Sequence, residues 1–244
     1  MTSGIKVAVD RGFFWLDQQQ PAELKEISRF YLVYNLWNRD EHRTNCLKES
    51  LQDIQSYSIR DISRAISSGI VERQNLSDLV LQIKEQQNQD GYWGNKDIYD
   101  TIYSLTALAN IGHYNPTGCN WILNNFSSEW KYPGTVSLII TALIKQGKAG
   151  NTDIYDTFIN REVQWLLDNK TSEGGWKYIA TTTIVIDALI DAGHPDAVND
   201  ATKWLLSTQN SDGSWGKGEK KNNTTAMVLA CFSRLTEFSE EQFL

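Results

Sequence analysis

The sequence contains little that could bind a metal ion or build a disulfide framework. Its three cysteines, Cys46, Cys119 and Cys231, lie far apart, and no Cys-x-x-Cys pair or Cys/His ligand spacing occurs. Such spacings identify most zinc sites and redox dithiols. We therefore expect reduced thiols, a cytoplasmic location and no metal site.

Long apolar runs and a basic excess are also missing. No apolar run approaches the roughly 18 residues that a membrane-spanning helix requires, and the first residues contain no apolar core of a signal peptide. With 30 acidic and 23 basic residues the net charge is −7, whereas nucleic-acid binding needs clustered Lys and Arg. The short basic cluster at 217–221 is interrupted by Glu219. The sequence predicts neither a membrane span nor a nucleic-acid partner.

Aromatic residues and repetition, by contrast, are abundant. The chain has nine Trp, ten Tyr and eight Phe, and four polar turns end in tryptophan. These turns are 86–93, 124–130, 169–176 and 209–215. Their tryptophans follow one another at intervals of 37, 46 and 39 residues. Self-similarity at such a period indicates an array built from one stacked supersecondary unit.

Helical patterns flank each turn. Amphipathic segments with Trp and Leu precede the turns, as at 164–167 and 203–206. A second segment follows each turn and opens with a residue type that caps helix N-termini well. These predicted caps are Asp100, Thr135, Thr181 and Asn223. Each unit is therefore expected to be a helix, a polar turn with Trp, and a second helix.

Extension of this pattern over the chain predicts twelve helices in six hairpins. Their expected ranges are 5–18, 22–37, 41–55, 58–69, 76–88, 99–111, 117–126, 135–147, 154–168, 179–192, 197–208 and 223–235. A closed ring suits these hairpins, because an open array needs polar capping units at both ends and neither end has one. We expect one all-α domain, 1–244, folded as an (α/α)6 barrel, with the repeats clearest over 76–235.

The glutamine-containing turn with Gly-x-Trp resembles the QW motif of squalene-hopene and oxidosqualene cyclases. The repeats are also similar to those of the β-subunits of protein prenyltransferases. The best match is 209–215, and 87–93 is next. The resemblance implies six inner and six outer helices around an apolar cavity. It also implies that the turn glutamine ties one hairpin to its neighbour and that the turn tryptophans pack as structure.

The resemblance further implies a class II-type terpene cyclase, in which an acid starts cyclisation of an isoprenoid chain. Cyclases of this family carry an Asp-x-Asp-Asp-Thr run at the mouth of an inner helix, and its middle Asp delivers the proton. The matching run here is 97–101, in which Asp97 and Asp100 are kept and Tyr99 stands at the donor position. A phenol, with a pKa of about 10, is a far weaker acid than a carboxyl with a pKa of about 4.

The prenyltransferase pattern is incomplete at the same helix. Those β-subunits place Asp-x-Cys zinc ligands there, where this chain has Asp100-Thr101-Ile102, and Ile102 cannot bind zinc. The phrase Asp-Ile-Tyr-Asp-Thr occurs again at 153–157, where it opens an outer helix. This second copy favours helix capping as one interpretation of Asp100.

Asp187 is a further candidate acid. It takes the place of Thr106 and Thr141 in an otherwise apolar inner helix. A buried carboxyl needs partners or a raised pKa, although Asp191 one turn later is typical of a wet helix face. The predicted catalytic residues are Asp97, Asp100 and Asp187.

The expected substrate is a hydrophobic isoprenoid chain in contact with aromatic side chains. The predicted substrate contacts are Tyr99, Tyr103, Tyr132 and Tyr178. Their π faces would stabilise carbocations, and Mg²⁺ could bridge a diphosphate to carboxylates if the substrate carries one. The alternatives are a non-catalytic prenyl- or lipid-binding module and a protein-interaction scaffold whose cavity is filled by side chains.

Overall fold

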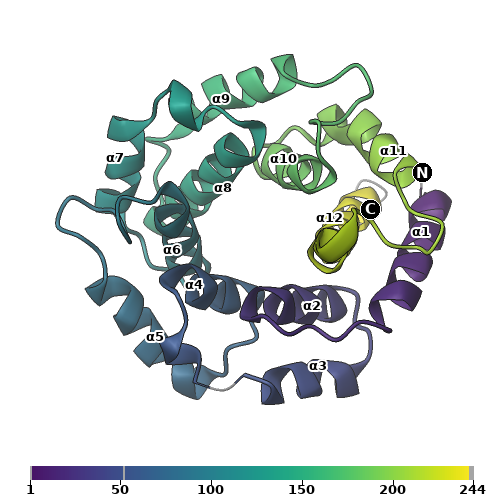
Figure 1. Ribbon diagram of the computed structural model, residues 1–244. Coiled ribbons are helices and arrows are strands. Elements are labelled where there is room, and N and C mark those ends of the chain that lie inside the picture. Colours follow the sequence, from purple (N-terminus) through teal and green to yellow (C-terminus); the bar gives the residue numbers. More distant parts are fainter. Residues whose placement is uncertain (1, 52, 242–244) are drawn as a thin grey trace.

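The computed structural model describes residues 2–51 and 53–241, which form twelve α-helices and four short 3-10 helices with no strand among them. Figure 1 shows two concentric rings of helices. The outer helices are α1 (Thr2–Leu16), α3 (Glu41–Glu49), α5 (Arg73–Glu85), α7 (Pro116–Asn125), α9 (Asp156–Asp168) and α11 (Asn199–Ser207). The inner helices are α2 (Leu24–Leu36), α4 (Ile59–Ser68), α6 (Ile98–Asn110), α8 (Pro133–Gly150), α10 (Ile179–Asp191) and α12 (Lys221–Glu241). The predicted all-α, (α/α)6 barrel is confirmed.

The inner helices form a closed circle. Each one packs against its two inner neighbours in chain order, and α12 packs against α2 to complete the ring. Each of α3, α5, α7, α9 and α11 packs on the inner helix before it, and α1 packs on α12. The first helix of the chain therefore covers the last inner helix, and α1 also contacts α11 (Figure 1).

Local sequence explains why α4 is a helix. The side chain of Ser58 caps its start and accepts a hydrogen bond from the backbone N–H of Asp61. Ile62 and Ile66 lie one turn apart and are buried, as the apolar face of a packed helix requires. Gly69, with φ +76°, ends the helix in the left-handed region that favours glycine.

The predicted helix starts need correction. Helix α6 begins at Ile98, and its N-cap is Asp97, whose side chain accepts hydrogen bonds from the backbone N–H groups of Tyr99 and Asp100. Asp100 therefore lies inside the first turn, as do the other three predicted caps, Thr135, Thr181 and Asn223. The Asp97 carboxylate satisfies two free donors of the first turn, which is why the helix starts there.

Two helix ends also differ from the prediction. Helix α3 stops at Glu49 instead of 55, and a separate 3-10 helix, Ile54–Ser56, follows it. Helix α12 continues to Glu241 instead of 235. Neither end carries a glycine or proline signal that would mark it in the sequence.

Three turn tryptophans are buried in the same way. Trp93, Trp176 and Trp215 are at most 1% exposed. The indole N–H of each donates to a carbonyl in the preceding outer helix, of Ile83 at 2.6 Å, Leu166 at 2.8 Å and Leu205 at 2.8 Å. The prediction that the turn tryptophans are structural is confirmed for these three, whereas Trp130 is only partly buried on a 3-10 helix.

Turn glutamines join neighbouring hairpins, as expected. The amide of Gln87 exchanges hydrogen bonds with Asn115 at the start of α7. The amide of Gln209 donates to the carbonyl of Ala8 in α1, at 2.8 Å. The second of these bonds lies at the seam where the ring closes.

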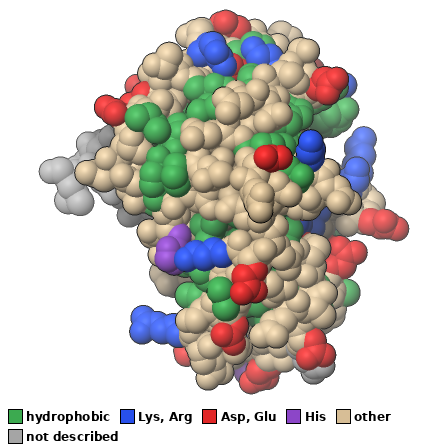
Figure 2. Space-filling model, turned by 90° about the vertical axis from the view of Figure 1, so that its left-hand side faces the viewer, with side chains coloured by type: hydrophobic (Ala, Val, Ile, Leu, Met, Phe, Trp, Pro, Cys, Tyr) green, Lys and Arg blue, Asp and Glu red, His purple; other side chains and the backbone are tan. Residues whose placement is uncertain are grey.

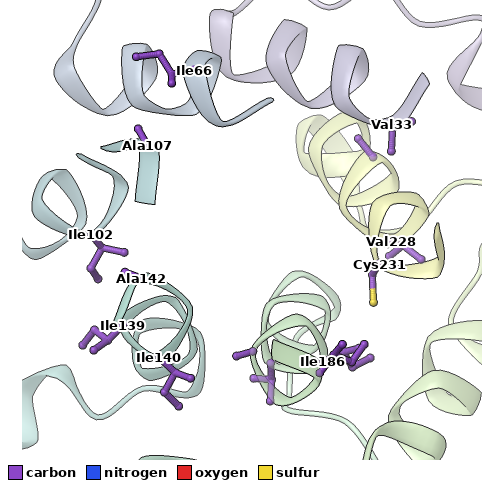
Figure 3. Packing of buried hydrophobic residues seen from close by; sticks show 14 of the residues in the cluster. Val33, Ile66, Ile102, Ala107, Ile139, Ile140, Ala142, Ile186, Val228 and Cys231 are labelled. Carbon is purple, nitrogen blue, oxygen red and sulfur yellow. The ribbon is translucent and has the colours of Figure 1, made fainter. Parts of the chain in front are cut away.

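The hydrophobic core runs around the ring, between the packed helices, and does not fill the centre of the barrel. Figure 3 shows buried side chains from all six inner helices, among them Val33, Ile66, Ile102, Ile186 and Val228. On the outer wall seen in Figure 2, acidic and basic side chains are interspersed. Among the described residues no helix is both long and apolar enough to cross a membrane.

Each inner helix keeps one partly exposed line of residues. On α10 this line is Thr181, Ile184 and Asp187, while the residues between them are buried. On α8, Leu138 and Thr141 follow the same spacing. An inner helix is covered by its inner neighbours and the outer ring, so this remaining face points into the middle of the barrel.

Candidate functional site

A cavity of about 600 Å³ opens at one end of the inner ring. Residues from the first turns of α2, α4, α6, α8 and α10 line it, so it lies at the N-terminal end of these helices. The lining residues are Lys25, Arg29, Arg60, Arg64, Tyr99, Tyr103, Tyr132, Pro133, Gly134, Thr135, Leu138, Asn169, Thr171, Trp176, Lys177, Tyr178, Thr181 and Ile184. A hollow of this size is typical of small-molecule sites.

The structure brings together the four tyrosines that the sequence predicts as substrate contacts. Tyr132 and Tyr178 precede α8 and α10 and are strongly exposed at the rim. Tyr99 and Tyr103 lie one turn apart on α6. The Tyr99 hydroxyl is 2.9 Å from the hydroxyl of Thr135, so this phenol is held by a neighbouring inner helix.

The wall of the cavity formed by α2 and α4 is cationic. Lys25 and Arg29 lie one turn apart on α2, and Arg60 and Arg64 lie one turn apart on α4. The guanidinium of Arg64 stacks over the ring of Tyr103 at 4.3 Å. Sequence reasoning missed this wall. A sequence pattern could have indicated it, because the predicted inner helices 22–37 and 58–69 each contain two basic residues spaced four apart.

Asp97 and Asp100 lie together but behind this wall. A single arginine bridges them, with Arg60 Nη2 2.9 Å from Asp97 and Nε 2.8 Å from Asp100. Neither carboxylate lines the cavity. The geometry is that of helix capping and charge neutralisation at the start of α6. The assignment of these two aspartates as acids stays a prediction.

Asp187 lies deeper in the ring. It follows Ile184 on the inward-facing line of α10, about 4.5 Å further along the helix axis. The side chain is one-third exposed, but one of its carboxylate oxygens, Oδ1, is buried with no hydrogen-bond partner among the described residues. Its nearest cation is Arg234 on α12, at 3.5 Å.

Burial raises the pKa of Asp187 to about 7, and the neighbouring Asp191 adds to this shift. Arg234 and Lys145 act in the opposite direction. The ion pair of Arg234 with Asp191, at 2.7 Å, is closer than its contact with Asp187. Asp187 is thus a carboxyl that holds a proton in a large fraction of molecules near neutral pH.

A second cavity, of about 620 Å³, lies at the other end of α8 and α10. Its lining is mostly polar and includes Asp153, Asp156 and Asp191. The described part of the chain contains no group of three or more His, Cys, Asp or Glu side chains placed to hold a metal ion. The first cavity differs from the second in being lined by four tyrosines and five cations and by no Asp or Glu among the described residues.

Neither a protein-family profile nor a curated protein sequence matches this chain. Solved structures do match in shape. The type II terpene cyclase MstE from Scytonema without ligand has a TM-score of 0.73 and 12% identity, over 97% of this chain and 99% of that chain. Two variants of the same cyclase also match at 12% identity. The one with geranylgeranyl dihydroxybenzoate as substrate gives a TM-score of 0.70, over 96% of this chain and 98% of that chain. The one with merosterolic acid A as product gives 0.72 over the same shares. At this identity the likeness establishes a terpene cyclase-like fold.

Proposed function

We propose that this protein is a terpenoid cyclase that binds an isoprenoid chain in the inner cavity and starts its cyclisation by protonation. The observation that carries the proposal is the 600 Å³ cavity with its aromatic wall, continued one helical turn deeper by Asp187. The likeness in fold to a type II terpene cyclase that binds a geranylgeranyl substrate supports it. This is the isomerase-type activity of class II cyclases.

Asp187 is the acid that the geometry favours. Its O–H bond would break and a new C–H bond would form at the terminal alkene, which leaves a tertiary carbocation on the chain. Neighbouring alkenes attack this cation to close rings, and loss of a proton to a base ends the sequence with no change in mass. Tyr99 and Tyr103 line the cavity, and an aromatic ring beside the chain would stabilise positive charge by about 0.5–2 kcal/mol.

Asp97 and Asp100 are the competing acids. Both are ion-paired to Arg60, and an ion-paired carboxylate is suited to neutralising charge rather than to donating a proton. Tyr99 between them is bonded to Thr135. For these reasons we assign the proton transfer to Asp187, and helix capping and neutralisation of Arg60 to the pair.

A turnover assay tests this assignment. The purified protein is incubated with geranylgeranyl dihydroxybenzoate and with geranylgeranyl diphosphate, and products are separated by liquid chromatography with mass detection. A cyclised product has the substrate's mass and a new retention time. Because a general acid contributes about 10²–10⁴-fold, we expect Asp187→Asn to lower turnover by at least about 100-fold.

Asp97→Asn is the matched control. Asparagine caps helices as well as aspartate does, so α6 should keep its start and turnover should stay within roughly threefold of the parent. The reverse pattern, with Asp97→Asn inactive and Asp187→Asn active, would return the acid role to Asp97 and Asp100.

A non-catalytic prenyl- or lipid-binding module is the second candidate. The feature that favours it is the absence of any Asp or Glu among the described residues that line the cavity. In this case the isoprenoids would bind and be recovered unchanged from the assay. The third possibility, a scaffold with a filled cavity, is disfavoured by the open volume.

A further inference from the structure

The first cavity has an unusual charge. Five of its lining residues, Lys25, Arg29, Arg60, Arg64 and Lys177, are cations, and none of the described residues that line it is acidic. The whole chain, in contrast, has a net charge of −7. Positive charge is therefore concentrated at this cavity.

Three of these cations lack an acidic partner. No carboxylate lies within 4 Å of Lys25, Arg29 or Lys177 in the described part of the chain, whereas Arg60 and Arg64 pair with aspartates. Arg29 donates only to the amide oxygen of Asn223, at 2.6 Å. The Nε of Arg64 is buried without a partner among the described residues. Lys25 and Arg29 thus line the cavity with charges that no carboxylate of the described residues neutralises.

The cations also crowd one another. Burial, followed by repulsion from Arg29 and Arg64, lowers the pKa of Lys25. Burial likewise lowers the pKa of Arg29, and Arg64 adds to this. Such crowding costs folding free energy unless an anion offsets it, and groups held at this cost cluster at functional sites.

Backbone donors add to the positive potential of the opening. Helices α8 and α10 start without a side-chain cap, although α4 and α6 have one. Gly134, Thr135 and Thr181, in the first turns of these two uncapped helices, line the cavity. The N-terminal end of a helix carries partial positive charge and attracts anions.

We propose that Lys25, Arg29 and Arg64 form a metal-independent site for the oxyanion head group of the substrate, either a carboxylate or a diphosphate. This inference rests on the proposed function. A head group held at the opening leaves the apolar chain to pass Tyr103, Leu138 and Ile184. The distal alkene is then the end that reaches Asp187, which is the end that a protonation-initiated cyclisation needs.

Binding measured without turnover tests the site. Isothermal titration calorimetry in EDTA compares geranylgeranyl diphosphate, geranylgeranyl dihydroxybenzoate and the uncharged geranylgeraniol. We expect at least one of the anions to bind about tenfold or more tightly than the alcohol, with an affinity that falls as salt rises. The tighter anion identifies the head group. Equal affinity for all three, or anion binding that appears only with Mg²⁺, would overturn the proposal.

Variants locate the anion. Arg29→Gln and Lys25→Gln should each weaken anion binding about tenfold or more, as removal of one partner of a partly buried charge contact does, and should leave geranylgeraniol unaffected. Lys203→Gln, on the exposed surface of α11, is the control and should change neither. Lys25 has no hydrogen bond among the described residues, so its variant tests the site even where Arg29→Gln disturbs Asn223. Equal weakening of anion and alcohol in both variants would refute the head-group site.

The outcomes for the head-group site and for the proposed cyclase function can be told apart. Tight anion binding with no cyclised product would refute the cyclase proposal and support the head-group site. Cyclisation of geranylgeraniol, with no preference for the anions, would support the cyclase proposal and refute the site.

Discussion

Asp187 is a partly buried carboxyl with charged neighbours. The groups that face it come from three inner helices: Asp191 from its own helix, Lys145 from α8, and Arg234 and Cys231 from α12. Burial raises the pKa of the Cys231 thiol as well. The Asp187 carboxyl therefore lies between one further carboxylate and two cations. Its Oδ1 atom is buried from solvent.

The raised pKa of Asp187 predicts how stability depends on pH. The folded protein keeps a proton on Asp187 up to a pKa of about 7, whereas the unfolded chain releases it at about 4. The folded state thus binds more protons in this window, so this contribution to the free energy of unfolding falls as pH rises from about 4 to 7. Asp187→Asn removes the effect and should stabilise the protein at pH 8 relative to pH 4.5.

We expect a gain of about 1 kcal/mol at pH 8, or about 2–4 °C in melting temperature, because solvent contact of the side chain weakens the effect. Thermal melts of the parent and variant at both pH values measure it. Asp191→Asn makes the same chemical change one turn away but breaks a 2.7 Å ion pair to Arg234, so it should not stabilise. A pH-independent effect of Asp187→Asn would contradict the raised pKa.

In three of the hairpins, a threonine of the inner helix holds the turn. The backbone N–H groups of Trp93, Trp176 and Trp215 donate to the hydroxyls of Thr101, Thr182 and Thr225, at 3.1, 2.9 and 2.9 Å. The second unit departs from this pattern. Its Trp130 N–H bonds to the carbonyl of Ser127, and Thr135 is free to bond to Tyr99 at the cavity.

The turn-holding hydroxyl predicts a local stability effect. Thr182→Val keeps the size of the side chain but leaves the buried N–H of Trp176 without an acceptor. We expect a loss of about 1–3 kcal/mol. Thr183→Val is the matched control, because the Thr183 hydroxyl is equally buried and donates only to Ala180 in its own helix. Chemical denaturation of both variants measures the difference, and equal losses would disprove the role of Thr182.

At the scale of the whole molecule, α1 closes the ring by taking the place of a following outer helix. In the turn 86–93, an added Cβ at Gly91 (φ +107°) would lie 2.4 Å from the carbonyl oxygen of Thr117, in the next outer helix. In the turn 209–215, an added Cβ at Gly213 (φ +91°) would lie 2.4 Å from the carbonyl oxygen of Arg11, in α1. The contact between the turn 209–215 and α1 therefore has the same geometry as the contact between the turn 86–93 and α7.

Gly213→Ala tests the seam. A left-handed backbone costs an alanine about 1–2 kcal/mol, and the overlap with Arg11 should add about 1–3 kcal/mol. Gly112→Ala is the control, since Gly112 has φ +78° and nothing within 4 Å of an added Cβ. Equilibrium unfolding should show a larger loss for Gly213→Ala, and equal losses would mean that α1 does not press on this turn.

Much of the fold was readable from local patterns. Cap residues, apolar spacing and the repeated polar turns predicted all twelve helices and their circular order. Individual boundaries failed where no cap or glycine marks them, as at the end of α3. The caps of α6, α8, α10 and α12 were misplaced because Asp, Thr and Asn occur both at the cap and inside the first turn.

The candidate site was only half predictable. The four tyrosines belong to repeated units whose inner faces are visible in the sequence, and they do line the cavity. Lys25, Arg29, Arg60 and Arg64 belong to hairpins without the turn motif, where no alignment of units points to the inner face. The sequence shows that these residues are basic, but it does not show that their side chains face the cavity.

The sequence by itself determined the helices and the hairpin repeat, because each depends on patterns within a few tens of residues. The closed ring followed from the number of these repeats. Only the tertiary structure decided which charges lie close together. Arg60 neutralises Asp97 and Asp100, and Asp187 lies 3.5 Å from Arg234, although these partners are remote in the chain. Electrostatic roles depend on distance and burial in space, and those exist only once the ring has closed.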